Sequence, residues 1–335
     1  MLCGFLTHRK NVSYVVAHFL KLACAPTNHA KTTFIADFLA YRSFTFLFWL
    51  RLSLFLFLTF VQGGQSLLWQ VAKNDTEKSL VINSLGRKWE LTFTTLVLFG
   101  GALFAAFPKF YATSFGGAYW VWILILFTFI VQAVSYEYRK KPGNFFGAWT
   151  YELFLLINGS VGILLIGAAV GTFFTGSNFT LNDYNQVTWT NSLRGLEAAF
   201  SVFNLSLGLF LVFNARVLGS MYLINNIDFS ALPDFEKRLR KACFINLLCA
   251  LPFLLYVLVG LLLMDGFGVG ADGAVSMVAN KYLLNLLAMP YVLVLLLAGL
   301  LLVVWGVIIT GLKTSTKGIW FGGLGNLQQC HKCIL

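Results

Sequence analysis

The sequence predicts an all-α protein, a polytopic bundle of transmembrane helices with about seven spans present. Of its 335 residues, 58% are hydrophobic and 11% are charged, whereas about 25% are charged in an average soluble domain. The apolar residues form continuous runs rich in Leu, Phe and Gly. Membrane-spanning strands would instead need short alternating segments, so we expect every span to be a helix.

Seven runs carry few or no charges and approach the roughly 20 residues that cross a bilayer. In chain order they cover residues 43–62, 91–107, 117–134, 153–174, 196–213, 242–264 and 283–312. We divide the chain into an atypical N-terminal segment at 1–42, which we expect to be non-native or disordered, the bundle at 43–312 and an atypical tail at 313–335.

Basic residues are concentrated on one side of the predicted membrane. When the segments between spans are assigned to alternate sides, one side receives fifteen Lys and Arg residues. The other side, without the N-terminal segment, receives only Lys109, Arg194 and Lys281. The basic side normally faces the cytoplasm, so we expect the N-terminus outside, in the periplasm of a bacterium. The positive charge therefore indicates topology rather than nucleic-acid binding.

The N-terminal segment contradicts this orientation, because residues 1–42 carry five Lys and Arg residues and no signal-peptide pattern. Arg51 lies near the middle of the first predicted span, where translocon scales give a cost of about 2.5 to 3.5 kcal/mol. Two interpretations are open: a functional intramembrane Arg, or an N-terminal region that does not reflect a native sequence. The second is favoured.

Metal and haem sites are hard to build from this sequence. Residues 30–329 contain no His, and their only thiols, Cys243 and Cys249, lie in one apolar run. A His-ligated haem or a His-based zinc or copper site therefore does not fit inside the bundle. The terminal Cys330-His331-Lys332-Cys333 supplies three ligands at most. We expect the chain to bind no metal and no cofactor by itself.

One acid stands at the entrance of an uncharged span. Glu90 follows Trp89 directly, and residues 91–107 contain no charge. A carboxylate at this depth needs water, a headgroup or a partner, which favours a role in proton movement. The alternative is an ordinary acid in the first turn of a helix. Glu137 lies near the same surface at the end of the next span, so the two acids could collect protons or could be interfacial charges.

Small and polar residues inside the spans predict helix–helix contacts. Gly167 and Gly171 form a G-x-x-x-G pair, and Gly100-Gly101 interrupt another span, so backbones can approach closely at both places. The amides of Asn158 and Asn204 are expected to hydrogen-bond neighbouring helices rather than a ligand. Arg194 and Glu197 are spaced to pair on one helix face.

A self-contained catalytic site is not apparent, because the chain shows no nucleophile with a matched base, no P-loop and no thiol relay. Several motifs in residues 60–175 nevertheless follow one another in a familiar order. They are Asn74-Asp75-Thr76-Glu77, Ile82-Asn83-Ser84, Trp89-Glu90, the run GGALFAAFP at 100–108, Glu137-Tyr138-Arg139 and the run GAAVGTFF at 167–174. Together they resemble subunit II of the cytochrome bd-type quinol oxidases. Many members carry aspartates in the region where this chain has Gln62 and Gln65. The run VQGGQ at 61–65 resembles the form found in Bacteroidetes-like bacteria.

The resemblance implies a haem-free subunit of a bacterial inner-membrane oxidase, which oxidises quinol and reduces dioxygen to water. Haems b and d would belong to the partner subunit I, with which the chain would form a heterodimer; a small accessory subunit and a structural quinone occur in some members. The resemblance also implies that Glu90 and Trp89 lie near the start of a proton path. Members typically have nine spans, two four-helix bundles plus one helix, so the tail at 313–335 is expected to replace missing spans.

Two other classes stay open. A secondary transporter of the bacterial inner membrane would place acids and broken helices near mid-bilayer, whereas the acids here lie at the ends of spans. A seven-span receptor or rhodopsin is suggested by the span count alone and lacks a Lys in the last span.

Overall fold

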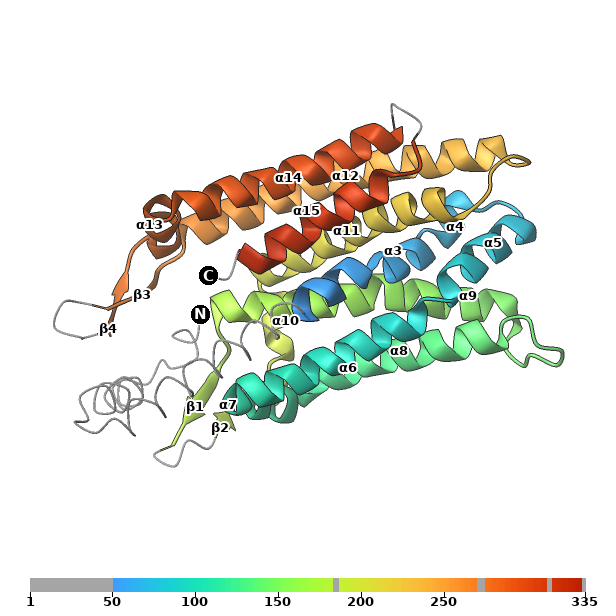
Figure 1. Cartoon of the computed structure of the whole chain (residues 1–335). Coiled ribbons are helices and arrows are strands. Elements are labelled where there is room, and N and C mark those ends of the chain that lie inside the picture. Colours follow the sequence, from blue (N-terminus) through green and yellow to red (C-terminus); the bar gives the residue numbers. More distant parts are fainter. Residues whose placement is uncertain (1–50, 183–186, 270–274, 312–314, 333–335) are drawn as a thin grey trace, which may run out of the picture.

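The computed structural model describes residues 51–182, 187–269, 275–311 and 315–332. These residues form a bundle of roughly aligned helices, with two small β-hairpins at one end (Figure 1). In the described part, five helical segments are long and apolar enough to cross a membrane: α8 (Tyr119–Tyr138), α9 to α10 (Gly147–Thr175), α11 (Val202–Asn226), α12 (Pro233–Leu263) and α14 (Pro290–Gly311). The predicted class, an all-α polytopic bundle, is confirmed.

The remaining elements connect or flank these helices. In chain order they are α3 (Phe60–Ser66), α4 (Leu68–Val71), α5 (Asp75–Gly86), α6 (Trp89–Ala106), α7 (Pro108–Tyr111), the π-helix η2 (Ala112–Gly117), the strands β1 (Phe179–Leu181) and β2 (Val187–Trp189), the 3-10 helix η4 (Leu196–Phe200), the strands β3 (Gly266–Val269) and β4 (Val275–Val278), α13 (Lys281–Ala288) and α15 (Gly318–Lys332). Each strand pairs with its neighbour in the sequence: β1 with β2 and β3 with β4, both antiparallel.

Most predicted spans correspond to helices, but two boundaries differ. The run at 196–213 begins as η4, and the long helix α11 starts only at Val202 and continues to Asn226. The run at 283–312 is two helices, because Met289 leaves the helical region at φ −121° and ψ 73° directly before Pro290. Proline disfavours helical backbone in the residue before it and provides no N–H for the helix it would continue.

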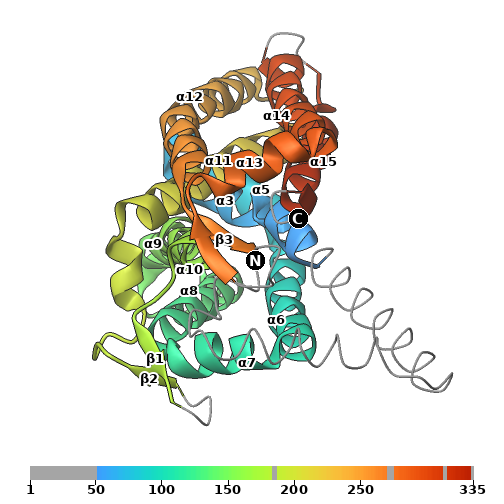
Figure 2. The same cartoon turned by 90° about the vertical axis from the view of Figure 1, so that its left-hand side faces the viewer.

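The first predicted span is described from Arg51 onward, where residues 51–58 are helical and lead into α3; residues 1–50 lie outside the described part. At the other end of the chain, α15 runs alongside α14 (Figure 2). Glycines allow this pairing: a Cβ on Gly325 would lie 2.6 Å from the carbonyl oxygen of Gly299. Part of the segment we expected to be an atypical tail is therefore helix in the structure.

The core lies where α3, α5, α11 and α12 meet, and Val81, Leu85, Leu218 and Leu239 are fully buried there. Glycines bring α3 against α11, since a Cβ on Gly63 would lie 1.8 Å from the carbonyl oxygen of Ala215. The expected close approach at Gly167 is confirmed, because its Cβ would lie 2.5 Å from Cα of Gly208.

The two ends of the bundle differ in charge. The connection 139–146, with Arg139, Lys140 and Lys141, lies at the end that holds α5, and so does the start of α12, with Lys237, Arg238, Arg240 and Lys241. The two hairpins, η2 and α13 lie at the opposite end (Figure 1). We call these the basic end and the hairpin end. The ion pairs described below all join side chains of the basic end.

Candidate functional site

Glu90 lies in the first turn of α6, at the basic end, and its side chain is exposed. Trp89 beside it is half-buried and stacks on Tyr136 of α8, with ring centroids 6.0 Å apart and planes 8° from parallel. The stack fixes the start of α6 against α8. It also puts the Glu90 carboxylate at the surface next to a buried aromatic contact.

Glu137 lies one residue beyond Tyr136 on α8, but it faces a different partner. Its carboxylate accepts a hydrogen bond from the Nζ of Lys141, one turn further along, and both side chains are exposed. This hydrogen bond raises the pKa of Lys141. No ion pair or hydrogen bond joins Glu137 to α6 in the described part of the chain, so the two predicted acids lie at one end without forming a pair.

A network of neutral polar side chains continues inward from Tyr136. The Tyr136 hydroxyl and the Nε2 of Gln132 both donate to Oε1 of Gln65, at 3.1 and 3.0 Å. Nε2 of Gln65 in turn donates to Oδ1 of Asn158, whose Nδ2 donates to Oγ1 of Thr128 at 3.4 Å. Asn158 therefore hydrogen-bonds neighbouring helices, as predicted.

This amide network is buried, and part of it has no partner. Gln62 is 1% exposed, and neither its Oε1 nor its Nε2 has a hydrogen-bond partner among the described residues; the same holds for Oε1 of Gln132. Buried polar atoms without partners cost about 1 to 3 kcal/mol each, so such groups normally mark water or function. The network adjoins Trp89 through Tyr136, which links it to the surface at Glu90.

The π-helix η3 (Asn158–Gly162) supplies the inner end of the network. It interrupts the long segment between α9 and α10, and π-bulges of this kind are frequent at functional sites. Small residues make room for it: a Cβ on Gly159 would lie 2.4 Å from the carbonyl oxygen of Gln62. The second predicted amide, Asn204, bonds Thr175 of the preceding helix, again as expected.

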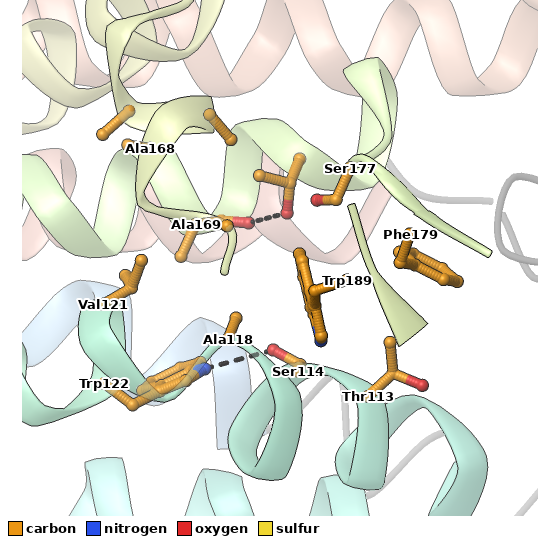
Figure 3. A pocket seen from close by; sticks show the side chains of 14 residues that line it. Thr113, Ser114, Ala118, Val121, Trp122, Ala168, Ala169, Ser177, Phe179 and Trp189 are labelled. Atoms are coloured by element: carbon orange, nitrogen blue, oxygen red, sulfur yellow. Dashed lines mark hydrogen bonds between the residues drawn. The ribbon is translucent and has the colours of Figure 1, made fainter. Parts of the chain in front are cut away.

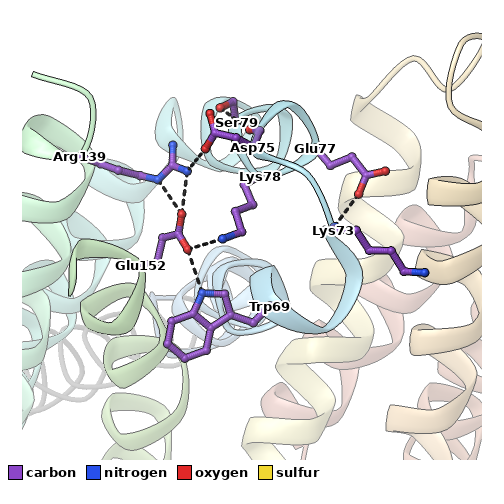
Figure 4. A network of polar contacts seen from close by, with 8 residues as sticks. All are labelled: Trp69, Lys73, Asp75, Glu77, Lys78, Ser79, Arg139 and Glu152. Atoms are coloured by element: carbon purple, nitrogen blue, oxygen red, sulfur yellow. Dashed lines mark hydrogen bonds and ion pairs between the residues drawn. The ribbon is translucent and has the colours of Figure 1, made fainter. Parts of the chain in front are cut away.

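A second cluster, which sequence reasoning missed, surrounds Glu152 on α9 (Figure 4). Its carboxylate accepts hydrogen bonds from Nε and Nη2 of Arg139, at 3.1 and 2.7 Å. It also accepts from Nζ of Lys78 at 2.8 Å and Nε1 of Trp69 at 2.9 Å. Nη2 of Arg139 also forms an ion pair with Oδ1 of Asp75, at 2.8 Å. The cluster therefore joins α4 and α5 to the α8–α9 pair.

A third contact ties α5 to α12. Glu77 accepts hydrogen bonds from the Nη2 of Arg238 at 2.6 Å and from the backbone N–H of Lys73 at 2.7 Å. Burial alone would raise the pKa of Glu77, but these bonds outweigh it and hold the pKa below its ordinary value. Nε of Arg238 donates to the carbonyl of Val71. The basic end is thus built as a connected charged layer over a neutral polar interior.

The hairpin end holds a partly open pocket of about 30 Å³, enough for about one water molecule (Figure 3). Its walls include Thr113, Trp122, Thr172 and Trp189. Nε1 of Trp122 donates to Oγ of Ser114 at 3.1 Å.

The predicted pairing of Arg194 with Glu197 is wrong: Glu197 instead accepts the N–H of Gly195 at 2.9 Å. The segment is a 3-10 helix preceded by left-handed backbone, so the i, i+3 geometry of an α-helix is absent.

Metal ligands are not gathered in the described residues, where no group of three or more His, Cys, Asp or Glu side chains lies together. Cys243 is buried and Cys249 half-buried, both without a disulfide. Cys333 of the terminal C-x-x-C lies outside the described residues. The functional groups of the described part are therefore carboxylates, guanidinium groups and amides.

The fold and these groups define a multi-pass helical membrane protein whose ion pairs in the described residues are concentrated at one end of the bundle and whose interior holds a network of neutral amides. Comparison with known proteins narrows the class. The chain belongs to the family of cytochrome bd terminal oxidase subunit II, whose pattern matches residues 42–326.

Similar proteins carry related names. The chain is 34% identical over 145 residues to the "Probable cytochrome oxidase subunit 2" of Haemophilus influenzae, covering 43% of this chain and 38% of that protein. It is 33% identical over 134 residues to the "Cytochrome bd-I ubiquinol oxidase subunit 2" of Escherichia coli K12, covering 39% and 35%. The chain therefore spans well under half the length of these curated relatives. It also shares its fold with a chain of the bd oxidase from Geobacillus thermodenitrificans, with a TM-score of 0.56, 12% identity, and coverage of 87% and 84%.

Proposed function

We propose that this chain is the haem-free subunit II of a cytochrome bd-type oxidase, an inner-membrane complex that oxidises quinol and reduces dioxygen to water. Family membership carries the proposal. Haems b and d would reside in a partner subunit I, with which the chain forms a heterodimer. The lack of His in residues 30–329 supports this division, because a haem iron held by His needs a ligand that these residues do not contain.

The transporter alternative is not favoured. Apart from Glu152, whose charge is balanced by Arg139 and Lys78, the acids of the described part lie at span ends or in connections. Transporters of that class instead place coupling groups near mid-bilayer in broken helices. The η3 interruption brings amides into the core, and amides do not carry a titrating charge.

We further propose that the basic end faces the cytoplasm, with the N-terminus outside, and that Glu90 takes up protons there. The distribution of Lys and Arg supports the orientation. Dioxygen reduction consumes protons, so a complex of this kind needs a group that loses and regains a proton at the water boundary. Glu90 is an exposed carboxylate at the start of an uncharged segment of α6, which suits that task. Trp89 would hold it in place through the stack on Tyr136.

The experiment is quinol-driven oxygen uptake per haem in the intact complex. Glu90→Gln removes the titrating proton and is expected to lower turnover by about a hundredfold, the lower end of the range that positioned acid–base groups contribute. Glu90→Asp keeps a carboxylate and should retain part of the activity. Haem content and the yield of complex should stay near those of the unmodified protein, because Glu90 is exposed.

Asp234→Asn is the matched control. Asp234 is also an exposed acid in the first turn of a helix at the same end, and within the described part of the chain its one ion pair is with Nζ of Lys237, at 3.6 Å. If Glu90 acts only on the helix dipole, both variants should lose about 0.3 to 1 kcal/mol of stability and keep full turnover. Unchanged turnover in Glu90→Gln would remove this residue from any proton path.

A further inference from the structure

The hairpin end carries an open cleft with a one-sided charge. The cleft has a volume of about 400 Å³ and lies between η2 and the β1–β2 hairpin; its lining residues are Ala112, Gly116, Gly117, Val187, Thr188, Trp189 and Arg194. A volume near 400 Å³ is within the range of small-molecule sites. Among the described residues, the lining includes one cation and no carboxylate, so this part of the cleft is suited to an anion.

Arg194 is held in an unusual backbone conformation at the edge of this cleft. Its φ is 42°, and Gly195 follows at 90°. A non-glycine residue in this region costs of the order of 1 to 3 kcal/mol and persists only where the surroundings impose it, often at binding sites. The guanidinium lies over the ring of Tyr119, 5.1 Å from its centroid. It forms no ion pair with the neighbouring acid Glu197, which accepts the Gly195 N–H instead.

Two other polar side chains line the cleft, Thr188 and Trp189. Nε1 of Trp189 is buried and has no partner among the described residues. It packs on Gly117, where a Cβ would lie 2.5 Å away, so only glycine leaves room for this indole edge. The hydroxyl of Thr188 lies 2.9 Å from that of Thr180, and either can donate. Arg194 is therefore the donor that is open to an oxyanion in this cleft, because Nε1 of Trp189 is covered and the Thr188 hydroxyl is hydrogen-bonded to Thr180.

The cleft lies at the level where a membrane span begins. Tyr119, which carries Arg194 on its ring, is the first residue of α8, and the next residue, Trp120, is 42% exposed. Tyr and Trp are enriched where a span meets the headgroup layer. Below them, Ile123, Phe127 and Ile130 form an exposed apolar stripe along α8, at 50% to 57% exposure. A molecule with its anion in the cleft could therefore lay an acyl chain along this stripe.

From these observations we propose that the cleft at Arg194 binds the phosphate of a membrane phospholipid, in the leaflet at the hairpin end, with an acyl chain along α8. A guanidinium binds phosphate through charge-assisted hydrogen bonds and is the side chain best suited to that geometry. The site is independent of proton uptake at Glu90, which lies at the opposite end of α6.

The test measures lipid binding by the intact, delipidated complex in detergent micelles, by native mass spectrometry and titration. The probes are phosphatidylglycerol, a phosphate-free diglucosyl lipid with the same acyl chains, and inorganic phosphate. Phosphatidylglycerol is expected to bind Arg194→Gln about tenfold more weakly than the unmodified complex, with binding retained in Arg194→Lys. Both replacements face the same backbone strain as Arg194, so they differ from each other only in charge.

Arg87→Gln is the control, since Arg87 is exposed at the basic end; it should bind as the unmodified complex does. Equal binding by Arg194→Gln would overturn the proposal, as would equal affinity for the diglucosyl lipid. Displacement of the lipid by inorganic phosphate alone at equal concentration would assign the cleft to a free anion instead. None of these outcomes depends on oxygen uptake, so they leave the proposed function untouched.

Discussion

Replacing Glu152 with Gln tests whether the buried charge cluster holds the basic end together. The side chains of Glu152 and Arg139 are each 3% exposed. The Glu152 carboxylate accepts hydrogen bonds from Arg139, Lys78 and Trp69 (Figure 4). The substitution removes the negative charge and turns an amide NH₂ toward a donor. It leaves the rest of the fold unchanged, because Gln has almost the shape of Glu.

The size of the effect follows from what remains around Arg139. Breaking a buried pair by removing one partner costs about 3 to 5 kcal/mol, because the other charge stays buried without compensation. Asp75 still faces Arg139 at 2.8 Å, but it is 75% exposed and screened by water. Lys78 is one-quarter exposed and can turn to water. We therefore expect Glu152→Gln to lower the free energy of unfolding by about 3 kcal/mol, the lower end of this range.

The assay is unfolding of the detergent-solubilised protein by increasing sodium dodecyl sulfate, followed by Trp fluorescence. Glu137→Gln is the control: it is the same chemical change in an exposed ion pair with Lys141, and surface pairs contribute about 0 to 1 kcal/mol. The double variant Arg139→Gln, Glu152→Gln should lose less than the sum of its single variants, because no uncompensated charge is left. A loss below about 1 kcal/mol for Glu152→Gln would refute the reasoning.

Two further predictions concern packing and pH. Gly63→Ala should destabilise the bundle by about 1 to 3 kcal/mol or more, since its Cβ would meet backbone atoms of Ala215, whereas Gly101→Ala, with no atom within 4 Å, should be neutral in the same unfolding assay. Because folding lowers the pKa of Glu77, the unfolded chain binds a proton first as pH falls. The contribution of Glu77 to the free energy of unfolding is therefore complete above about pH 5 and is lost as pH drops through the lower pKa of the folded state. Glu77→Gln should therefore flatten the acid side of the stability profile, and an unaltered slope would contradict this.

The long helices could be predicted from the sequence because a bilayer imposes one requirement, a continuous apolar run, that is visible in composition. The close contact at Gly167 was predictable for the same kind of reason, since small residues at that spacing leave room for another backbone. The break before Pro290 also had a signal in the sequence, the proline itself. By contrast, Gly101 faces open space, because the same small residue can lie on either face of a helix.

The Glu152 cluster was not predicted because its members are far apart in the chain. Glu152 was treated as the boundary of a span, and its partners Lys78 and Trp69 lie 74 and 83 residues away. Only the tertiary arrangement of α5 against α8 and α9 brings them together. The one signal was an acid at the start of a span with Arg139 shortly before it. Glu90, Trp89 and Glu137 remain predictions of function, with positions now known and roles untested.

The same cluster imposes an order on biogenesis. The charged face of α5 receives its buried counter-charges from α8 and α9, whose contributing residues are synthesised 64 to 74 positions later. At about 5 to 20 residues per second, the ribosome needs roughly 3 to 15 s to supply them. During that interval α5, a short helix of the basic end, has been synthesised without these partners, and it can settle only after the helical hairpin of α8 and α9 is inserted. Insertion of this second hairpin is thus the step at which the basic end closes, and a delay there would leave a half-assembled layer open to membrane proteases.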